Sequence, residues 1–236
     1  MRGPLPPGLP AAVLFDWDNT LVDTLPVIQA ALAETFRTYG RTSWTLEEVK
    51  RNVRLSARDA FPLLFGDQAQ EAQRVFYDAF RARHLDALTA MPQAADLLEF
   101  LAGWAVPMAV VSNKGGPLLR KEVSHLGWER FFGSVVGAGD AARDKPAGDP
   151  ALLALEQLGL SPGRGVWFVG DTDVDLACAH AAGLSAVLLR GTPPQTGEFA
   201  TEPPDAHFTE AQAFRTAVED RSGAVREPLP GHNVRA

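Results

Sequence analysis

A short apolar run that ends in two closely spaced acids constrains this chain more than any other feature. Residues 13–15 are Val, Leu and Phe, and Asp16 and Asp18 follow almost at once. Uninterrupted apolar runs of this kind are typical of buried strands in parallel sheets. The carboxyl ends of such strands form the edge at which open α/β sheets bind ligands. Two neighbouring carboxylates repel each other unless a cation or a proton compensates them, so this stretch is a candidate functional site.

After residue 91 the chain alternates between strand-like and helical patterns. Following a first strand at 12–16, we expect strands at 108–111, 134–136, 166–169, 186–189 and 206–208. Between and after them we expect helices at 94–104, 118–126, 150–158, 174–182 and 210–219. Repeated strand–helix units with short connections predict the doubly wound α/β class, in which helices cover both faces of a parallel sheet.

The segment between the first strand and residue 88 has a different pattern, because its apolar residues recur at helical spacing without strand-like alternation. We expect helices at 27–39, from Thr45 onward, at 56–65 and at 68–84. These predict an all-helical cap domain at 25–87, inserted into an α/β core domain formed by 11–24 and 88–220. The two ends, 1–10 and 221–236, are rich in proline and glycine, and we expect them to be flexible tails.

Composition excludes several classes of function. The 236-residue chain has a net charge of −7, which argues against a general binder of nucleic acid or of anionic membranes. An anionic substrate remains compatible with that charge, because bound Mg²⁺ can invert the local field. The single cysteine excludes an intramolecular disulfide and a cysteine-based zinc site. No stretch approaches the roughly 18 apolar residues of a membrane helix, so we expect a cytoplasmic protein, monomeric or homodimeric, without a membrane partner.

Polar side chains at the ends of other apolar runs add further candidates. Ser112 and Asn113 follow such a run, and the serine hydroxyl and the next backbone amide can donate to a phosphoryl oxygen. Lys145, in a Lys-Pro pair, offers an ammonium that can neutralise a carboxylate and a phosphoryl group. Asp171 and Asp175 offer the hard oxygen ligands that Mg²⁺ prefers.

Each of these features also has an ordinary structural interpretation. Two acids after a strand can form a solvated turn or cap a helix, and a serine there can cap the next helix. A Lys-Pro pair is usually a surface turn. The acid spacing after residue 170 also suggests a calcium loop, but the remaining ligands of such a loop are missing. It is the combination of four features at four strand ends that favours a functional site.

Together the four segments resemble, in order, the motifs of the haloacid dehalogenase superfamily of phosphohydrolases. Asp16-Trp17-Asp18-Asn19-Thr20 resembles its DxDxT signature, and the segment from Gly170 to Asp175 resembles its GDxxxD motif. The resemblance spans about 12–220 and implies the α/β core of that superfamily with a helical cap. Asn19 replaces the family's commoner glycine; asparagine tolerates left-handed backbone, so we expect the turn to be kept.

The resemblance also implies roles for individual residues. Asp16 would attack phosphorus and become an aspartyl phosphate, while Asp18 would protonate the leaving oxygen and later deprotonate water. The phosphoryl group would be bound by Thr20, Ser112, Asn113 and Lys145. The Mg²⁺ ligands would be Asp16, the backbone carbonyl of Asp18 and Asp171, with Asp175 binding through water or orienting that shell.

The size and placement of the cap look most like the phosphoglycolate phosphatase-type branch, which implies a Mg²⁺-dependent phosphatase acting on a small phosphomonoester. A phosphomutase, which returns the phosphoryl group to its substrate, is the nearest alternative. A phospho-accepting signalling module is the alternative from another class, although receiver domains are shorter and lack a lid and the second acid. A binding protein without turnover is disfavoured, because every motif residue needed for the chemistry is present.

Substrate selection would depend on the cap. Arg54 and Arg58 lie in a basic, polar segment, and we expect one of them to face the cleft and select an anionic small molecule. The alternative is a solvated helix face with ion-pair partners. Trp17 is expected to pack at the hinge of the cap or at the rim of the cleft, and His84 to be a surface or packing residue.

Overall fold

Six parallel strands form the central sheet of the computed structural model, which describes residues 4–223. The strands, in the order in which they lie side by side, are β5 (Ser134–Ala138), β4 (Met108–Gly115), β1 (Ala12–Phe15), β6 (Val166–Gly170), β7 (Ser185–Leu189) and β8 (Ala206–Phe208). Every neighbouring pair is parallel. The predicted α/β class with a parallel sheet is therefore confirmed.

Strand β1 is central, and its alternating side chains serve two separate cores. Val13 and Phe15 pack on the face covered by α5 (Ala94–Gly103), α6 (Gly116–His125) and α9 (Ala211–Gly223). Ala12 and Leu14 pack on the opposite face, under α7 (Asp149–Leu158) and α8 (Asp173–Ala181). All four β1 side chains are fully buried, and burial of each large one contributes roughly 1.5–3 kcal/mol. Helices on both faces confirm the doubly wound arrangement.

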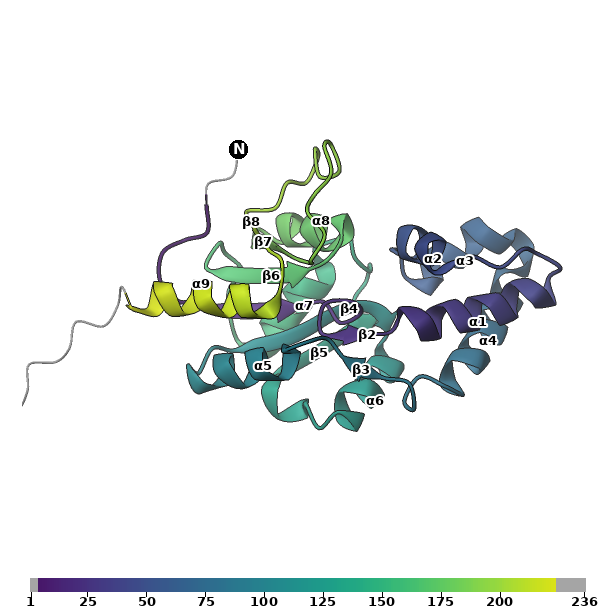
Figure 1. Cartoon of the computed structure of the whole chain (residues 1–236), viewed down its shortest axis with the longest axis horizontal. Helices are drawn as coiled ribbons and strands as arrows, with labels where there is room; N and C mark the ends of the chain where they lie inside the picture. Colours follow the sequence, from purple (N-terminus) through teal and green to yellow (C-terminus); the bar gives the residue numbers. More distant parts are fainter. Residues whose placement is uncertain (1–3, 224–236) are drawn as a thin grey trace, which may run out of the picture.

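Along the chain, four helices separate the first strand from the rest of the sheet domain. In space they are grouped beyond one end of the sheet (Figure 1). They are α1 (Leu25–Thr38), α2 (Leu46–Asn52), α3 (Ala57–Phe65) and α4 (Ala69–Arg81), with a 3-10 turn at Gly66–Gln68. Thr45 and Ser56 cap α2 and α3 as their sequence predicts. The single helix expected at 68–84 is shorter, because the 3-10 turn precedes it and the helix ends at Arg81.

The insertion has a hydrophobic cluster whose largest side chains are aromatic and to which α6 contributes one leucine. Its largest buried members are Phe36, Phe61, Phe65, Phe76 and Phe80. Phe61 stacks against Phe65, and Phe76 stacks against Phe80. Such a cluster lets the helices pack as a unit beside the sheet domain rather than as loops on its surface.

A two-stranded antiparallel ribbon, which the sequence did not predict, joins the insertion to the sheet domain. It consists of β2 (Val22–Asp23) and β3 (Thr89–Ala90). Two residues a side are too few to produce a detectable alternation of apolar and polar residues, and this explains the omission. Asn19, in the turn before β2, has φ 63° and donates its backbone N–H to Val22 at 2.7 Å, so the expected left-handed turn is confirmed.

The two segments expected to be flexible tails overlap with described structure. Leu5 is buried against the core formed by α5 and α9, and Ala11 donates a backbone hydrogen bond to Gly165 at 2.8 Å. At the other end α9 continues to Gly223. The rest of these two segments, 1–3 and 224–236, lies outside the described residues. None of the helices within 4–223 combines the length and apolar character needed to cross a membrane.

Candidate active site

The sheet brings the predicted site residues to one edge. Strand β1 lies between β4 and β6, and the chain extends the sheet outward from it in both directions, which makes this edge a topological switch point. Asp16 directly follows β1, and Asp171 directly follows β6. Ser112 lies within β4, which continues to Gly115 rather than ending at 111 as expected, and it directly follows the last regularly paired residue, Val111. Lys145 comes from the loop after β5 and also points to this edge. The local order of strand, turn and helix therefore places residues far apart in sequence side by side.

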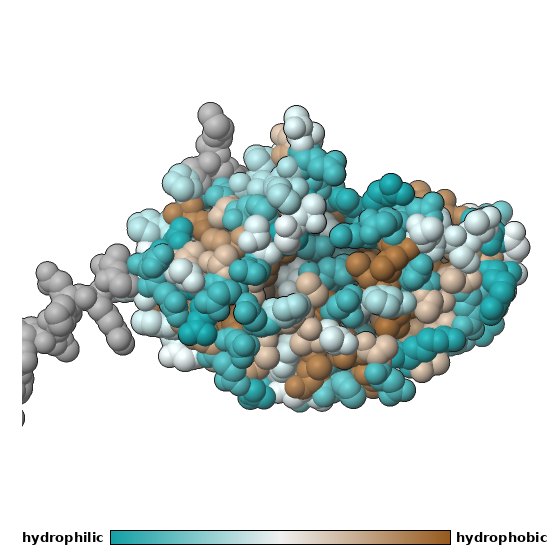
Figure 2. Space-filling view, in the orientation of Figure 1, coloured by the Kyte–Doolittle hydropathy of each residue, from teal (hydrophilic) through white to brown (hydrophobic). Residues whose placement is uncertain are grey.

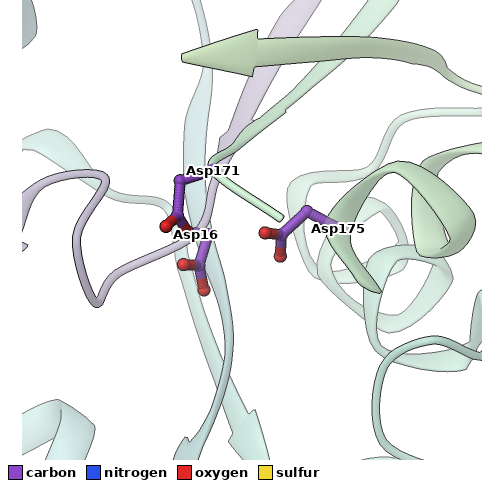
Figure 3. A group of neighbouring side chains, drawn as sticks. All are labelled: Asp16, Asp171 and Asp175. Carbon is purple, nitrogen blue, oxygen red and sulfur yellow. The ribbon is translucent and has the colours of Figure 1, made fainter. Parts of the chain in front are cut away.

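Three carboxylates converge at the switch point. Asp16, Asp171 and Asp175 each offer an oxygen, and the three oxygens lie within 4.8 Å of one another. Figure 3 shows Asp175 reaching from its helix toward the other two. Burial raises the pKa of Asp16 to about 7, and the carboxylates of Asp175 and Asp18 add to this effect against the opposing Lys145. Burial, followed by Asp175 and Asp16, likewise raises the pKa of Asp171.

This donor set fits a hard divalent cation. Mg²⁺ is usually bound by one or two carboxylates and keeps several waters, which a third carboxylate nearby can orient. A cation would also remove the cost of holding buried like charges together. The structure therefore brings together three of the predicted metal-binding residues, Asp16, Asp171 and Asp175. The carboxylate of Asp18 lies outside this group.

Lys145 stabilises two of the three carboxylates. Its Nζ donates to Oδ1 of Asp16 and to Oδ1 of Asp175, each at 2.6 Å, and to the carbonyl of Val111 at 3.0 Å. Burial alone would lower the pKa of this lysine, but the carboxylates of Asp16 and Asp175 hold it above its usual value. The other carboxylate oxygen of Asp175 accepts from the backbone and hydroxyl of Thr172, which fixes its orientation. Lys145 is thus a permanent, rigidly held positive charge beside Asp16.

Asp18 has a different environment, although it is only two residues away. Its Oδ1 accepts from Nζ of Lys114 at 2.6 Å and from the hydroxyl of Thr24. Lys114 in turn donates to Oε2 of Glu122 at 2.6 Å. Burial would lower the pKa of Lys114, but Asp18 and Glu122 raise it overall, so this lysine stays charged. The Asp18 carboxylate is therefore held away from the cluster around Asp16.

Glu122 anchors a buried network behind Asp18. It is fully buried, and accepts from Nε1 of Trp17 at 2.7 Å while Nδ1 of His84 lies 2.8 Å from its other oxygen. Trp17 is itself fully buried and packs edge-on against Trp128, with ring centroids 5.7 Å apart. His84 is buried as well, just beyond the end of α4. The sequence did not indicate Lys114 or Glu122, because the contact of Lys114 with Asp18 and those of Glu122 with Trp17 and His84 join segments far apart in sequence.

The predicted phosphate-binding side chains differ in how they are engaged. Ser112 is buried, and its Oγ accepts from the backbone of Lys114 at 3.1 Å. The Asn113 side chain donates to the carbonyls of Arg54 and Lys145 and accepts from the backbone of Lys145, so it holds the lysine loop in place. The buried hydroxyl of Thr20 has no hydrogen-bond partner within the described part of the chain.

The two arginines proposed for substrate selection lie in different places. Arg54 lines the cleft and forms an ion pair with Asp173 at the start of α8. Arg58 pairs with the buried Asp144 at 3.0 Å, and its side chain is 47% exposed outside the cleft lining. The structure therefore brings Arg54, but not Arg58, to the candidate site.

A cleft of about 140 Å³ lies between the helical insertion and the sheet domain. Asp16, Asp18, Lys145 and Asp171 form part of its floor, and side chains of the insertion form the opposite wall. In Figure 2 the molecule is hollowed between these two parts. The cleft can admit a small molecule whose anionic group meets the lysine and the carboxylate cluster of the floor.

Comparison with known proteins gives consistent matches. Residues 13–189 match the family described as haloacid dehalogenase-like hydrolase. Phosphoglycolate phosphatase 1 of Pseudomonas aeruginosa is 29% identical over 194 residues, which cover 77% of this chain and 70% of that relative. Fructose-1-phosphate phosphatase YqaB of Escherichia coli is 30% identical over 186 residues, which cover 76% of this chain and 96% of that relative.

Solved structures show the same fold. A haloacid dehalogenase-like hydrolase from Streptococcus pneumoniae superimposes with a TM-score of 0.77 at 23% identity, covering 87% of this chain and 97% of that one. The covered share is too large for the match to be confined to the sheet domain or to the helical insertion alone.

Proposed function

Because the chain belongs to the haloacid dehalogenase-like hydrolases, we propose that it is a Mg²⁺-dependent phosphatase that hydrolyses a small phosphomonoester through an aspartyl phosphate on Asp16. In this proposal residues 25–87 are a cap domain on a core formed by 11–24 and 88–220. The two relatives described above are named for different substrates, phosphoglycolate and fructose 1-phosphate. What those substrates share is a phosphomonoester, and this shared chemistry is what we carry over.

Two differently held acids, Asp16 and Asp18, are the observation that carries the proposal. Asp16 lies beside Lys145 and two further carboxylates. A carboxylate nucleophile needs such positive charge nearby, because it must approach an anionic phosphoryl group. Asp18 lines the same cleft, but its carboxylate accepts hydrogen bonds from the hydroxyl of Thr24 and the ammonium of Lys114 and lies outside the carboxylate cluster. Two carboxylates with different surroundings can divide nucleophilic and acid–base work between them.

The reaction follows from these positions. One Asp16 oxygen bonds to phosphorus while the ester P–O bond breaks, and the leaving oxygen takes the proton of Asp18. Asp18 then accepts a proton from water, whose oxygen attacks phosphorus, and the Asp16–phosphorus bond breaks to release inorganic phosphate. Lys145 neutralises charge on Asp16 and on the phosphoryl oxygens throughout.

Asp16, Asp171 and the backbone of Asp18 would bind Mg²⁺, and Asp175 would orient its water shell. Bound there, the ion supplies Lewis-acid stabilisation of the phosphoryl charge and masks the repulsion between Asp16 and the substrate. The crowding of three carboxylates at the switch point supports this assignment. The free hydroxyl of Thr20 and the buried Ser112 are available to phosphoryl oxygens beside that ion.

Phosphate release tests the proposal. The protein would be assayed with phosphoglycolate, fructose 1-phosphate and 4-nitrophenyl phosphate, with Mg²⁺ and with excess chelator, beside Asp16→Asn and Asp23→Asn. Asp23 is an exposed acid of the same segment and serves as the matched control. We expect Mg²⁺-dependent release that Asp16→Asn lowers by on the order of a thousandfold or more and Asp23→Asn leaves unchanged. Release that survives in Asp16→Asn, or that ignores the chelator, would contradict the mechanism.

A further inference from the structure

The wall that the insertion contributes to the cleft is strongly apolar. Its side chains come from α1, from the segment around Trp44, from the loop between α2 and α3, and from α3 and α4. Five of its apolar members are only partly buried or are exposed, so they keep surface available to the cleft: Leu25, Trp44, Val53, Leu55 and Leu64. Figure 2 shows apolar side chains gathered on the insertion beside the hollow.

This wall offers little to a charged leaving group. Among the described residues of the insertion that line the cleft, Arg54 is the only charged one. Its guanidinium is already paired with Asp173, and its Nε donates to the carbonyl of Arg51. A substrate carboxylate placed against this wall would lose its hydration, and it would have to compete with Asp173 for the guanidinium of Arg54. Both effects disfavour binding of a charged leaving group.

We propose that this apolar wall is a binding site for the leaving group of the substrate, and that this group is an aliphatic or aromatic one. The proposal rests on the phosphatase activity proposed above. The floor of the cleft bears the charges that a phosphoryl group needs, whereas the wall can stabilise the rest of an ester only by removing apolar surface from water. A cleft charged at one end and apolar at the other suits an ester with the same polarity.

A homologous series of alkyl phosphates isolates this effect. Ethyl, butyl and hexyl phosphate have leaving groups of nearly equal intrinsic reactivity and differ in apolar surface. We expect kcat/KM to rise by about fourfold for each added methylene until the wall is covered. We expect hexyl phosphate to be hydrolysed with a higher kcat/KM than phosphoglycolate.

Neighbouring leucines of α3 provide a matched pair of variants. Leu64 lines the cleft, whereas Leu63 is 78% exposed and outside the lining. We expect Leu64→Gln to lower the ratio of kcat/KM for hexyl over ethyl phosphate by roughly tenfold, and Leu63→Gln to leave it unchanged. Leu55→Gln, in the loop before α3, gives a second test that does not disturb a helix.

The outcomes separate the two proposals. A flat or falling dependence on chain length, with the esters still hydrolysed, overturns the apolar leaving-group site and leaves the phosphatase intact. Equal ratios in Leu64→Gln, Leu55→Gln and Leu63→Gln also overturn it, because the preference would then arise elsewhere. Failure to release phosphate from every ester, including 4-nitrophenyl phosphate, overturns both proposals.

Discussion

At the scale of single residues, the chain places two acids two positions apart in unlike surroundings. Asp16 shares Lys145 with Asp175 and lies in the carboxylate cluster, whereas Asp18 shares Lys114 with Glu122. Both lysines are buried, so neither acid is simply exposed to water. The protein separates the two carboxylates by giving each its own cation.

The stability of the metal-free protein is expected to depend on the protonation of Asp16. Burial raises its pKa from 3.8 to about 7, so between these values the folded protein holds a proton that the unfolded chain has released. The Asp16 contribution is therefore full below about pH 4 and is lost as pH rises through 7. The Asp16→Asn variant has no carboxyl group at this position to ionise, so it does not lose this stability. The unfolding free energy of the variant minus that of the wild type should therefore increase between pH 4 and pH 8, by on the order of a few kcal/mol.

Urea unfolding of both proteins in chelator, at several pH values, measures this difference. Saturating Mg²⁺ is the control: it stabilises the charged carboxylates of the wild type and should diminish the advantage of the variant at high pH. Stability curves that stay parallel from pH 4 to pH 8 without metal would contradict the raised pKa.

Lys114 and Glu122 are expected to position Asp18 for proton transfer. Lys114→Met or Glu122→Gln should lower kcat for an alkyl phosphate by roughly tenfold to a hundredfold, because Asp18 loses its alignment. The loss should be smaller for 4-nitrophenyl phosphate, whose leaving group needs no proton. Lys121→Met, at an exposed lysine next to Glu122 on α6, is the matched control. Equal losses on both esters would indicate a general structural effect instead.

At the scale of elements, the sequence predicted the strand ends better than their connections. Each apolar run and the polar residue that follows it are adjacent in sequence, so the position of Asp16, Ser112 and Asp171 at one sheet edge could be inferred locally. The ribbon of β2 and β3 was missed because its strands are two residues long. Glu122 was missed because its contacts with Trp17 and His84 join segments that only the folded chain brings together.

The close approach of β5 to the start of α6 illustrates such a tertiary constraint. A Cβ on Gly137 would lie 2.7 Å from the backbone N of Gly116, the first residue of α6. Gly137→Ala should therefore cost about 1–3 kcal/mol of unfolding free energy, because backbone cannot move aside as a side chain can. Gly103→Ala, where nothing lies within 4 Å, should change it by less than about 0.5 kcal/mol. Urea unfolding of the two variants measures this, and equal stabilities would contradict it.

At the scale of the whole molecule, both connections between the sheet domain and the helical insertion contact the hydrogen-bond network around Asp18. Thr24 directly precedes α1 and donates to Asp18, and His84 follows α4 and contacts Glu122. Asp18, the proposed acid–base residue, is thus held by both ends of the insertion as well as by β4 and α6. The cleft between the two parts therefore contains the residues proposed to bind the phosphoryl group, to donate the proton and to contact the leaving group.

The most direct test of the central claim is a burst experiment with Asp18→Asn and 4-nitrophenyl phosphate in Mg²⁺. The 4-nitrophenolate group leaves without a proton, so Asp16 can still be phosphorylated, whereas the attacking water has lost its base. We expect release of one 4-nitrophenolate per active site followed by a slow phase, with a phosphoryl group on the peptide that contains Asp16 after acid quench. Linear release without a burst and without a phosphorylated Asp16 peptide would contradict the assignment of Asp16 as the nucleophile.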